Sequence, residues 1–206
     1  MAVITISRQF GAGGLTLGKA IADMLGYTFA SDEIIKMVAE KARVSENWVK
    51  MVEKEAGGRL QKLLGTIVPK NLIERVLDER HGYFDEEIFI DLLHDIITKI
   101  AEEGNCLILG RGGQYILRDY PDTIHVLLIG DKNYRVGFMQ EKYKLSLAQA
   151  TQAVNNGDKR RINLYRKFNK SDYDLPAHYH LTINMSKVSL QKAAQTVRCM
   201  VSQNML

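Results

Sequence analysis

A chain of 206 residues with 46% hydrophobic and 25% charged residues has the composition of a globular protein, which excludes wholesale disorder. The length predicts one folding unit with room for a small inserted subdomain. A formal net charge of +4 suits an anionic small ligand as well as weak contact with nucleic acid, so charge alone does not separate these two kinds of partner.

Cysteine usage and hydropathy exclude further classes. Cys106 and Cys199 lie far apart without C-x-x-C spacing, so neither a zinc cluster nor a disulfide framework is indicated. No apolar run approaches the roughly 20 residues of a membrane helix, and the N-terminus lacks a signal-peptide pattern. We therefore expect a soluble, cytoplasmic protein without a membrane partner.

The first 21 residues have the order strand, glycine-rich turn, helix. The apolar run of residues 2–6 predicts a strand, and in the following helix Leu15, Leu17 and Ile21 take the expected buried positions. The turn carries Arg8, Gly11, Gly13 and Gly14. Such glycines let backbone N–H groups converge on an anion at a helix N-terminus, where the helix dipole also favours negative charge. A tight connection without a ligand is the alternative.

The turn departs from the phosphate-loop motif G-x-x-x-x-G-K-[ST]. With Gly13 as the second glycine, Arg8 stands at the first glycine, Gly14 at the lysine and Leu15 at the hydroxyl residue. Thr16 is then the hydroxyl that could substitute as a magnesium contact. We hypothesise that the Arg8 guanidinium replaces the missing lysine.

Downstream, Gly26 is expected to end the first helix, and residues 27–30 to form a second strand. Apolar residues at helical spacing predict helices over residues 31–43 and 45–56. This pair also fits a helix-turn-helix template loosely, which leaves DNA reading as an alternative to plain packing. A helical insertion is expected over residues 57–83.

The second half alternates helices with apolar strands. Its expected elements are a helix over 85–103, a strand that ends in the turn around Arg111, a short helix over 114–117, a strand over 123–129, helices over 131–144 and 146–168, a strand over 179–184 and a helix over 188–201. This alternation predicts an α/β fold in which helices flank a parallel β-sheet and ligands bind at the carboxyl ends of the strands. Arg8 and Arg111 both follow such ends.

Phosphoryl transfer needs an anion-binding backbone and cations around the transferred group. The candidate cations are Arg8, Lys36, Arg111, Arg135, Arg160, Arg161 and Arg166. The last three could face a nucleotide from one helix, with Asp158 orienting one of them by a bidentate ion pair. A solvated basic face is the alternative.

Aromatic and histidine side chains add little. Tyr165 and Tyr179 could stack on a base or pack over basic side chains. The five histidines show no metal-site or catalytic-triad pattern.

Together these motifs resemble the cytidylate kinase-like family. ITISRQFGAGGLTLGKAIA is similar to that family's opening strand and phosphate loop in a lysine-less form, and LILGRGGQYIL to its strand, arginine and glycine turn. SDEIIKMVAEKARVS is similar to its acceptor-side helix, and GDKRRINLYRKF with YHLTINMS to its lid arginines and last strand. The similarity extends from Ala2 to about Val197 but leaves out residues 57–83.

The resemblance implies one P-loop domain of the nucleoside monophosphate kinase type over residues 1–206, with a helical acceptor-side insertion at about 57–83 and a lid at about 131–178. It also implies transfer of the ATP γ-phosphoryl group to CMP, dCMP or a related acceptor with Mg²⁺, and makes nucleic acid an unexpected partner. Because Gly14 replaces the lysine, a catalytically weakened nucleotide-binding sensor or partner-binding protein of the same fold is the alternative.

The same resemblance assigns roles to individual residues. The implied catalytic residues are Arg8, Arg161 and Arg166. The implied ATP-binding residues are Gly11, Ala12, Gly13, Gly14, Leu15, Thr16, Arg135 and Arg160, with Thr16 also the metal contact. The implied acceptor-binding residues are Ser31, Asp32, Lys36 and Arg111. The lid lacks the arginine and aspartate spacing of true cytidylate kinases.

Overall fold

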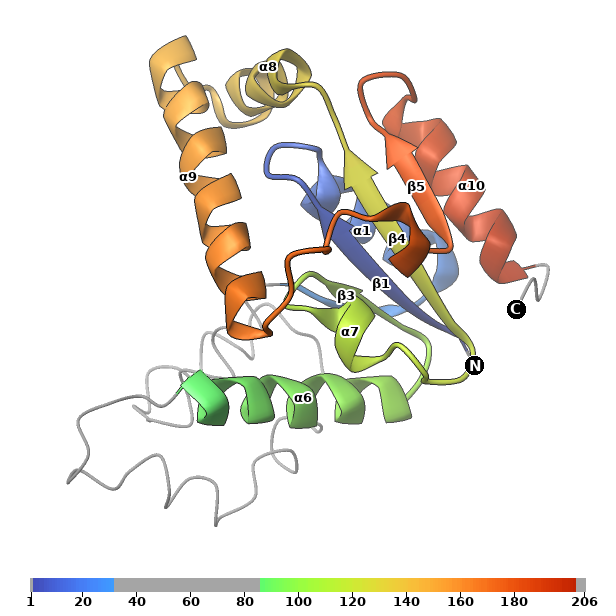
Figure 1. Cartoon of the computed structure of the whole chain (residues 1–206). Helices are drawn as coiled ribbons and strands as arrows, with labels where there is room; N and C mark the ends of the chain where they lie inside the picture. Colours follow the sequence, from blue (N-terminus) through green and yellow to red (C-terminus); the bar gives the residue numbers. More distant parts are fainter. Residues whose placement is uncertain (1, 32–85, 203–206) are drawn as a thin grey trace, which may run out of the picture.

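The computed structural model describes residues 2–31 and 86–202, and in this part of the chain five strands form one sheet (Figure 1). The sheet order is β2 (Thr28–Ala30), β3 (Cys106–Leu109), β1 (Val3–Arg8), β4 (Thr123–Ile129) and β5 (Leu181–Asn184). Every neighbouring pair is parallel, which confirms the predicted α/β class. All five carboxyl ends therefore lie at one edge of the sheet.

Helices connect the strands and cover the sheet. They are α1 (Gly14–Leu25), α6 (Glu86–Glu102), α7 (Gly113–Ile116), α8 (Lys132–Tyr143), α9 (Leu147–Lys167) and α10 (Leu190–Ser202), with a 3₁₀ turn at Pro176–His178. As predicted, Gly26 ends α1 in the left-handed conformation, where its N–H bonds the Ala22 carbonyl. Ser146 and Gln149 form a capping box that starts α9 directly after α8. The two helices make a hairpin, which we call the α8–α9 hairpin.

One face of the sheet is apolar. The side chains of Ile4 and Ile6 alternate with Thr5 and Ser7 along β1, since successive residues of a strand point to opposite faces. On the Ile4 side, α1 and α10 close a core that includes Leu17, Ile21, Leu107, Val126, Leu128, Ala194 and Val197, all nearly inaccessible to solvent. Burial of this apolar area stabilises the sheet and therefore holds the carboxyl ends of its strands in place.

The opposite face carries buried polar groups. Thr5 Oγ1 lies 2.7 Å from His125 Nδ1, and the backbone N–H of His125 donates to His180 Nδ1 at 3.0 Å. The two imidazole rings are 5.3 Å apart. Burial, followed by the neighbouring His180, lowers the pKa of His125 to about 4. This polar face leads, through Ser7, to the carboxyl edge of the sheet.

Two expectations differ from the structure in detail. Leu15 was expected to be buried with Leu17, but 42% of it is exposed because the first turn of α1 borders a cavity. The last strand begins at Leu181 rather than at residue 179, since Tyr179 caps the 3₁₀ turn and its N–H donates to the Pro176 carbonyl. The expected helices over 31–43 and 45–56, with the helix-turn-helix alternative, and the insertion over 57–83 lie outside the described residues.

In the described part of the chain, no helix combines the length and apolarity that crossing a membrane requires.

The buried histidine makes stability depend on pH. The pKa of His125 in the folded protein, about 4, lies below the ordinary value of 6.5, so the unfolded chain takes up the proton first. The stabilisation from keeping this ring neutral is complete above pH 6.5 and is lost as the pH falls towards 4. We expect the free energy of unfolding from urea titrations to fall in this window with a slope of up to about 1.4 kcal/mol per pH unit from this group.

His125→Gln should lose this part of the slope, whereas His94→Gln, on the exposed surface of α6, should keep it. Equal slopes for wild type and His125→Gln would show that the ring does not carry the effect.

Candidate functional site

The loop between β1 and α1 has a backbone that requires glycine. Gly11 and Gly13 have φ angles of 83° and 81°, in the left-handed region. A Cβ atom on Gly11 would lie 2.8 Å from the carbonyl oxygen of Arg135 in α8. The loop is therefore tightly curved and in contact with the α8–α9 hairpin, and in Figure 1 it lies near both helices of the hairpin.

The loop ends at a helix N-terminus that is open to an anion. Gly13 is the N-cap of α1 and supplies no side-chain hydrogen bond, and no acidic residue lies in the first turn. The first N–H groups of a helix have no partner within it and carry the positive end of the helix dipole. This arrangement is suited to binding a phosphate group.

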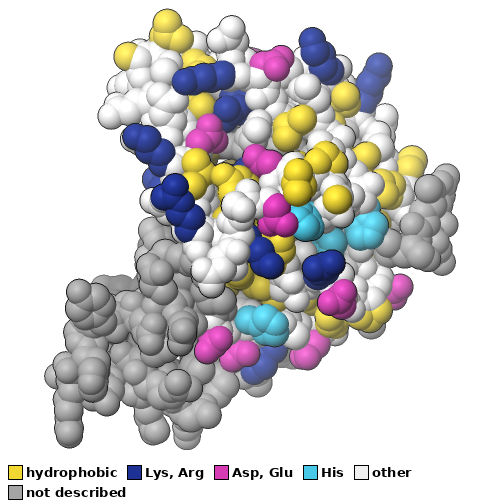
Figure 2. Space-filling view, in the orientation of Figure 1, with side chains coloured by type: hydrophobic (Ala, Val, Ile, Leu, Met, Phe, Trp, Pro, Cys, Tyr) yellow, Lys and Arg dark blue, Asp and Glu magenta, His cyan; other side chains and the backbone are white. Residues whose placement is uncertain are grey.

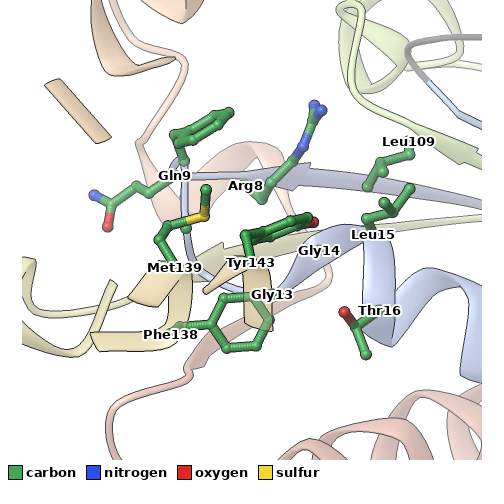
Figure 3. Close-up of a pocket in the computed structure, with 12 residues that line it drawn as sticks. Arg8, Gln9, Gly13, Gly14, Leu15, Thr16, Leu109, Phe138, Met139 and Tyr143 are labelled. Carbon is green, nitrogen blue, oxygen red and sulfur yellow. The ribbon is translucent and has the colours of Figure 1, made fainter. Parts of the chain in front are cut away.

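A cavity of about 270 Å³ opens over this helix N-terminus (Figure 3). Its lining residues are Arg8, Gln9, Phe10, Gly11, Gly13, Gly14, Leu15, Thr16, Leu109, Phe138, Met139 and Tyr143. Six of the predicted site residues thus line one cavity, whereas Ala12 lies beneath it in the core with no exposed surface. None of these described lining residues carries a carboxylate.

Arg8 occupies the space beside Gly14. A Cβ atom on Gly14 would lie 2.9 Å from Arg8 Cγ and 3.3 Å from both Arg8 Cβ and Arg8 Cδ. The stem of Arg8 therefore fills the volume into which any side chain at position 14, a lysine included, would extend. In Figure 3 the Arg8 side chain extends from the end of β1, with Gly14 below it at the start of α1.

One wall of the cavity comes from α8 and was not predicted as part of the site. Phe138, Met139 and Tyr143 lie opposite Leu15 in Figure 3, and the Phe138 ring comes within 3.5 Å of a Cβ position on Gly13. Phe138 and Met139 have the pattern of ordinary core residues in an amphipathic helix. Their role at the cavity could be found only from the packing of α8 against the loop.

Arg135 and Asp158 hold the loop from the hairpin. Arg135 is buried, and its Nη1 donates to the Phe10 carbonyl at 2.9 Å while its Nε donates to the Gly130 carbonyl at 3.0 Å. The same Nη1 lies 3.0 and 2.8 Å from the two carboxylate oxygens of Asp158. Asp158 was expected to orient Arg160, Arg161 or Arg166, but its partner is Arg135 on the neighbouring helix. The described bonds of Arg135, an expected ATP-binding residue, are to protein groups.

Arg161 lies in a second polar cluster next to the loop. Its Nη2 donates to Ser7 Oγ at 3.0 Å and to Asp174 at 2.6 Å. The guanidinium also lies 5.1 and 4.9 Å from the ring centroids of Tyr165 and Tyr173, which stack on each other at 4.5 Å. Tyr165 is fully buried and shares hydrogen bonds of 3.0 Å with Ser7 and Gln114, so it packs within the protein.

The remaining predicted residues are distributed around the carboxyl edge of the sheet. Arg160 lies over the Phe10 ring at 5.8 Å, and Arg166 is exposed further along α9. Figure 2 shows Lys and Arg side chains along the edge of the molecule that α9 forms. Ser31 follows β2 and is buried, and Arg111 follows β3 with a φ of 54°. Asp32 and Lys36 lie outside the described residues.

The side chains of the cavity fit phosphate groups better than a protein-bound metal ion. Mg²⁺ sites in proteins usually use one or two carboxylates together with water and substrate phosphates. Thr16 offers a hydroxyl at the cavity, and no group of three or more His, Cys, Asp or Glu is assembled among the described residues. A magnesium ion here would be held by nucleotide phosphates and water, with Thr16 as the protein contact.

Comparison with known proteins agrees with this geometry. A model of the cytidylate kinase-like family matches residues 3–187. No curated protein matches the sequence. An uncharacterised protein from Eubacterium ventriosum ATCC 27560 has a similar structure, with a TM-score of 0.69 and 21% identity over 98% of each chain.

Two shikimate kinases also have similar structures. The enzyme from Bacteroides thetaiotaomicron has a TM-score of 0.51 and 13% identity, and the similarity covers 98% of each chain. The enzyme from Acinetobacter baumannii, solved with shikimate, has a TM-score of 0.51 and 15% identity, and covers 100% of this chain and 96% of its own. These similarities confirm the predicted P-loop kinase fold.

The strain of the loop can be measured with two glycines that differ in their surroundings. Gly11 and Gly26 both have left-handed backbone conformations, but a Cβ atom on Gly26 would meet nothing within 4 Å. Gly26→Ala should lower the free energy of unfolding by about 1–2 kcal/mol from backbone strain alone. Gly11→Ala should lower it further, because the Arg135 carbonyl must also move. Equal losses in urea titrations would mean that the contact between the loop and α8 carries no energy.

Proposed function

This chain belongs to the cytidylate kinase-like family, and on that premise we propose that it transfers the γ-phosphoryl group of ATP to CMP, dCMP or a related acceptor. The P-loop kinase fold, the anion-ready N-terminus of α1 and the cavity above it support this proposal. Catalysis of phosphoryl transfer consists mostly of positioning and charge stabilisation, which such a site can provide.

The position of Arg8 is the observation that carries the proposal. A P-loop without its lysine needs another cation, and Arg8 fills the space beside the residue that replaces the lysine. A guanidinium stays charged at any physiological pH and can bind two phosphate oxygens at once. Arg8 would therefore stabilise the charge on the transferred phosphoryl group.

The other roles follow the architecture of the sheet edge. The N–H groups from Gly11 to Thr16 would bind the donor phosphates, except for that of Ala12, which donates to the Gln9 carbonyl at 3.1 Å. Arg160, Arg161 and Arg166 would act from the lid. Ser31 and Arg111 would bind the acceptor, together with Asp32 and Lys36. Bound ATP and Mg²⁺ would supply the phosphoryl group and neutralise its charge. The bond from the β,γ-bridging oxygen to the γ-phosphorus breaks, and a bond from an acceptor phosphate oxygen to that phosphorus forms.

The activity can be tested with a coupled assay that measures ADP release from ATP and Mg²⁺. We expect release that depends on an added acceptor, with CMP and dCMP compared against AMP, GMP, UMP and shikimate. Tight ATP binding in calorimetry without turnover for any acceptor would contradict the enzyme and favour a nucleotide-binding sensor. The lack of a carboxylate among the described residues that line the cavity is the observation that favours that second candidate.

The role of Arg8 can be tested with a pair of substitutions. Arg8→Ala should lower kcat/KM by about 10²- to 10³-fold, as loss of a transition-state charge does. Gly14→Lys alone should not help, since the Arg8 stem occupies the space. In the double variant the space is open, and the added lysine should restore part of the activity.

Arg198→Ala, on the exposed surface of α10, serves as the matched control and should leave kcat/KM unchanged. Unchanged binding and turnover in Arg8→Ala would exclude the proposed role of this guanidinium.

A further inference from the structure

Phe10 is the point where the phosphate loop and the α8–α9 hairpin interlock. A Cβ atom on Gly157 of α9 would lie 2.1 Å from Phe10 Cγ and 2.6 Å from Phe10 Cβ, so the ring lies directly on the helix backbone. Gly157 is buried, and the Phe10 ring also packs against the small core of the hairpin formed by Val136, Met139, Ala150 and Val154. The loop therefore contributes a side chain to the core of the hairpin.

The backbone of Phe10 is held from the same side. Its N–H donates to Asp158 Oδ1 at 3.2 Å, and its carbonyl accepts from Arg135 Nη1 at 2.9 Å. Arg135 and Asp158 are themselves joined by the 2.8 Å ion pair. Both polar groups of one loop residue are thus bonded to one ion pair that bridges α8 and α9. Hydrogen bonds with charged partners are among the stronger ones in proteins.

These contacts fix the direction of the next N–H group. The Phe10 carbonyl and the Gly11 N–H belong to one planar trans peptide and point in opposite directions. The bond from Arg135 to the carbonyl therefore turns the Gly11 N–H away from Arg135. If this peptide rotated, a carbonyl oxygen would replace the N–H, and its partial negative charge would repel an anion in the loop.

We propose that Gly157, Asp158 and Arg135 are positioning residues that clamp Phe10 and so orient the Phe10–Gly11 peptide for binding of phosphate groups. This inference rests on the proposed function in that the loop binds the donor phosphates. Because the clamp draws on both helices, anion affinity of the loop depends on how the hairpin is docked. The hairpin then acts on the donor site in two ways: it orients the loop that binds the phosphates, and it supplies arginines.

The first test measures ADP affinity by calorimetry and the Michaelis constants for donor and acceptor. Asp158→Ala leaves the Phe10 N–H and Arg135 without their carboxylate, and Gly157→Ala displaces the Phe10 ring. We expect each to weaken ADP binding by about 10- to 100-fold and to raise the KM for ATP with little change in the KM for the acceptor. Gly137→Ala in α8, where a Cβ atom meets nothing within 4 Å, is the control and should bind ADP as the wild type does.

Rescue variants separate positioning from loss of folding. Asp158→Asn keeps an oxygen that accepts the Phe10 N–H and should weaken ADP binding less than Asp158→Ala. Phe10→Ala combined with Gly157→Ala removes the colliding ring and should bind ADP more tightly than Gly157→Ala alone. Wild-type ADP affinity in both Gly157→Ala and Asp158→Ala would overturn the clamp.

Hydrogen exchange of the ligand-free protein gives a result that does not depend on nucleotide binding. Amides of residues 9–14 should exchange faster in Gly157→Ala and Asp158→Ala than in the wild type or Gly137→Ala. Unchanged exchange in both variants would overturn the clamp even if the enzyme is active. Faster exchange in a protein that binds no ADP would support the clamp while excluding the proposed function.

Discussion

The close contact between the Arg8 stem and Gly14 is the constraint on which the site depends. A side chain at position 14 would collide with the Arg8 stem, and the backbone of Arg8 is fixed because this last residue of β1 pairs with Leu128 of β4. In the ordinary motif the cation is carried by the loop at the start of the helix. In the proposed site it would be carried by Arg8, the last residue of a central strand, so the sheet would set its position.

The proposed replacement of the P-loop lysine by Arg8 would also change the kind of cation. A lysine ammonium is a point charge on a flexible stem, whereas a guanidinium is planar and binds two oxygens in a fixed geometry. Packing of the Arg8 stem against Gly14 limits the positions that the group can reach. An arginine fixed at a strand end could bind only a phosphate that the loop holds close to it. The orientation of the loop would therefore decide whether the two groups meet.

The arginines of the α8–α9 hairpin divide into two kinds. Arg135 and Arg161 lie inside and pair with Asp158 and Asp174, as buried guanidinium groups must to offset the loss of hydration. Arg160 and Arg166 are exposed on α9. An anion that reached Arg161 would meet the carboxylate of Asp174, 2.6 Å from the guanidinium. The arginines of this region are therefore not interchangeable, although the sequence presents them as one cluster.

The sequence predicted the fold well because strong local signals coincide with the strands and turns. Apolar runs mark β1, β3 and β4, and glycine marks the end of α1. The family and the parallel sheet are confirmed. Pairing across the hairpin was not predictable, since nothing local shows whether Asp158 faces its own helix or the neighbouring one. The apolar wall of the cavity was missed because its residues match ordinary core packing, and the exposure of Leu15 follows from the cavity beside it.

The charge around the cavity has a consequence for metal use. In a site with carboxylates, a nucleotide triphosphate approaches like charges, and the metal ion offsets their repulsion. The described lining residues here carry a guanidinium and no carboxylate, and the first turn of α1 has no acidic residue. A phosphate group beside these described residues would therefore meet a guanidinium and a helix N-terminus rather than a like charge. At the proposed donor site, nucleotide binding would therefore depend less on Mg²⁺ than transfer would, because only transfer builds up charge on the moving phosphoryl group.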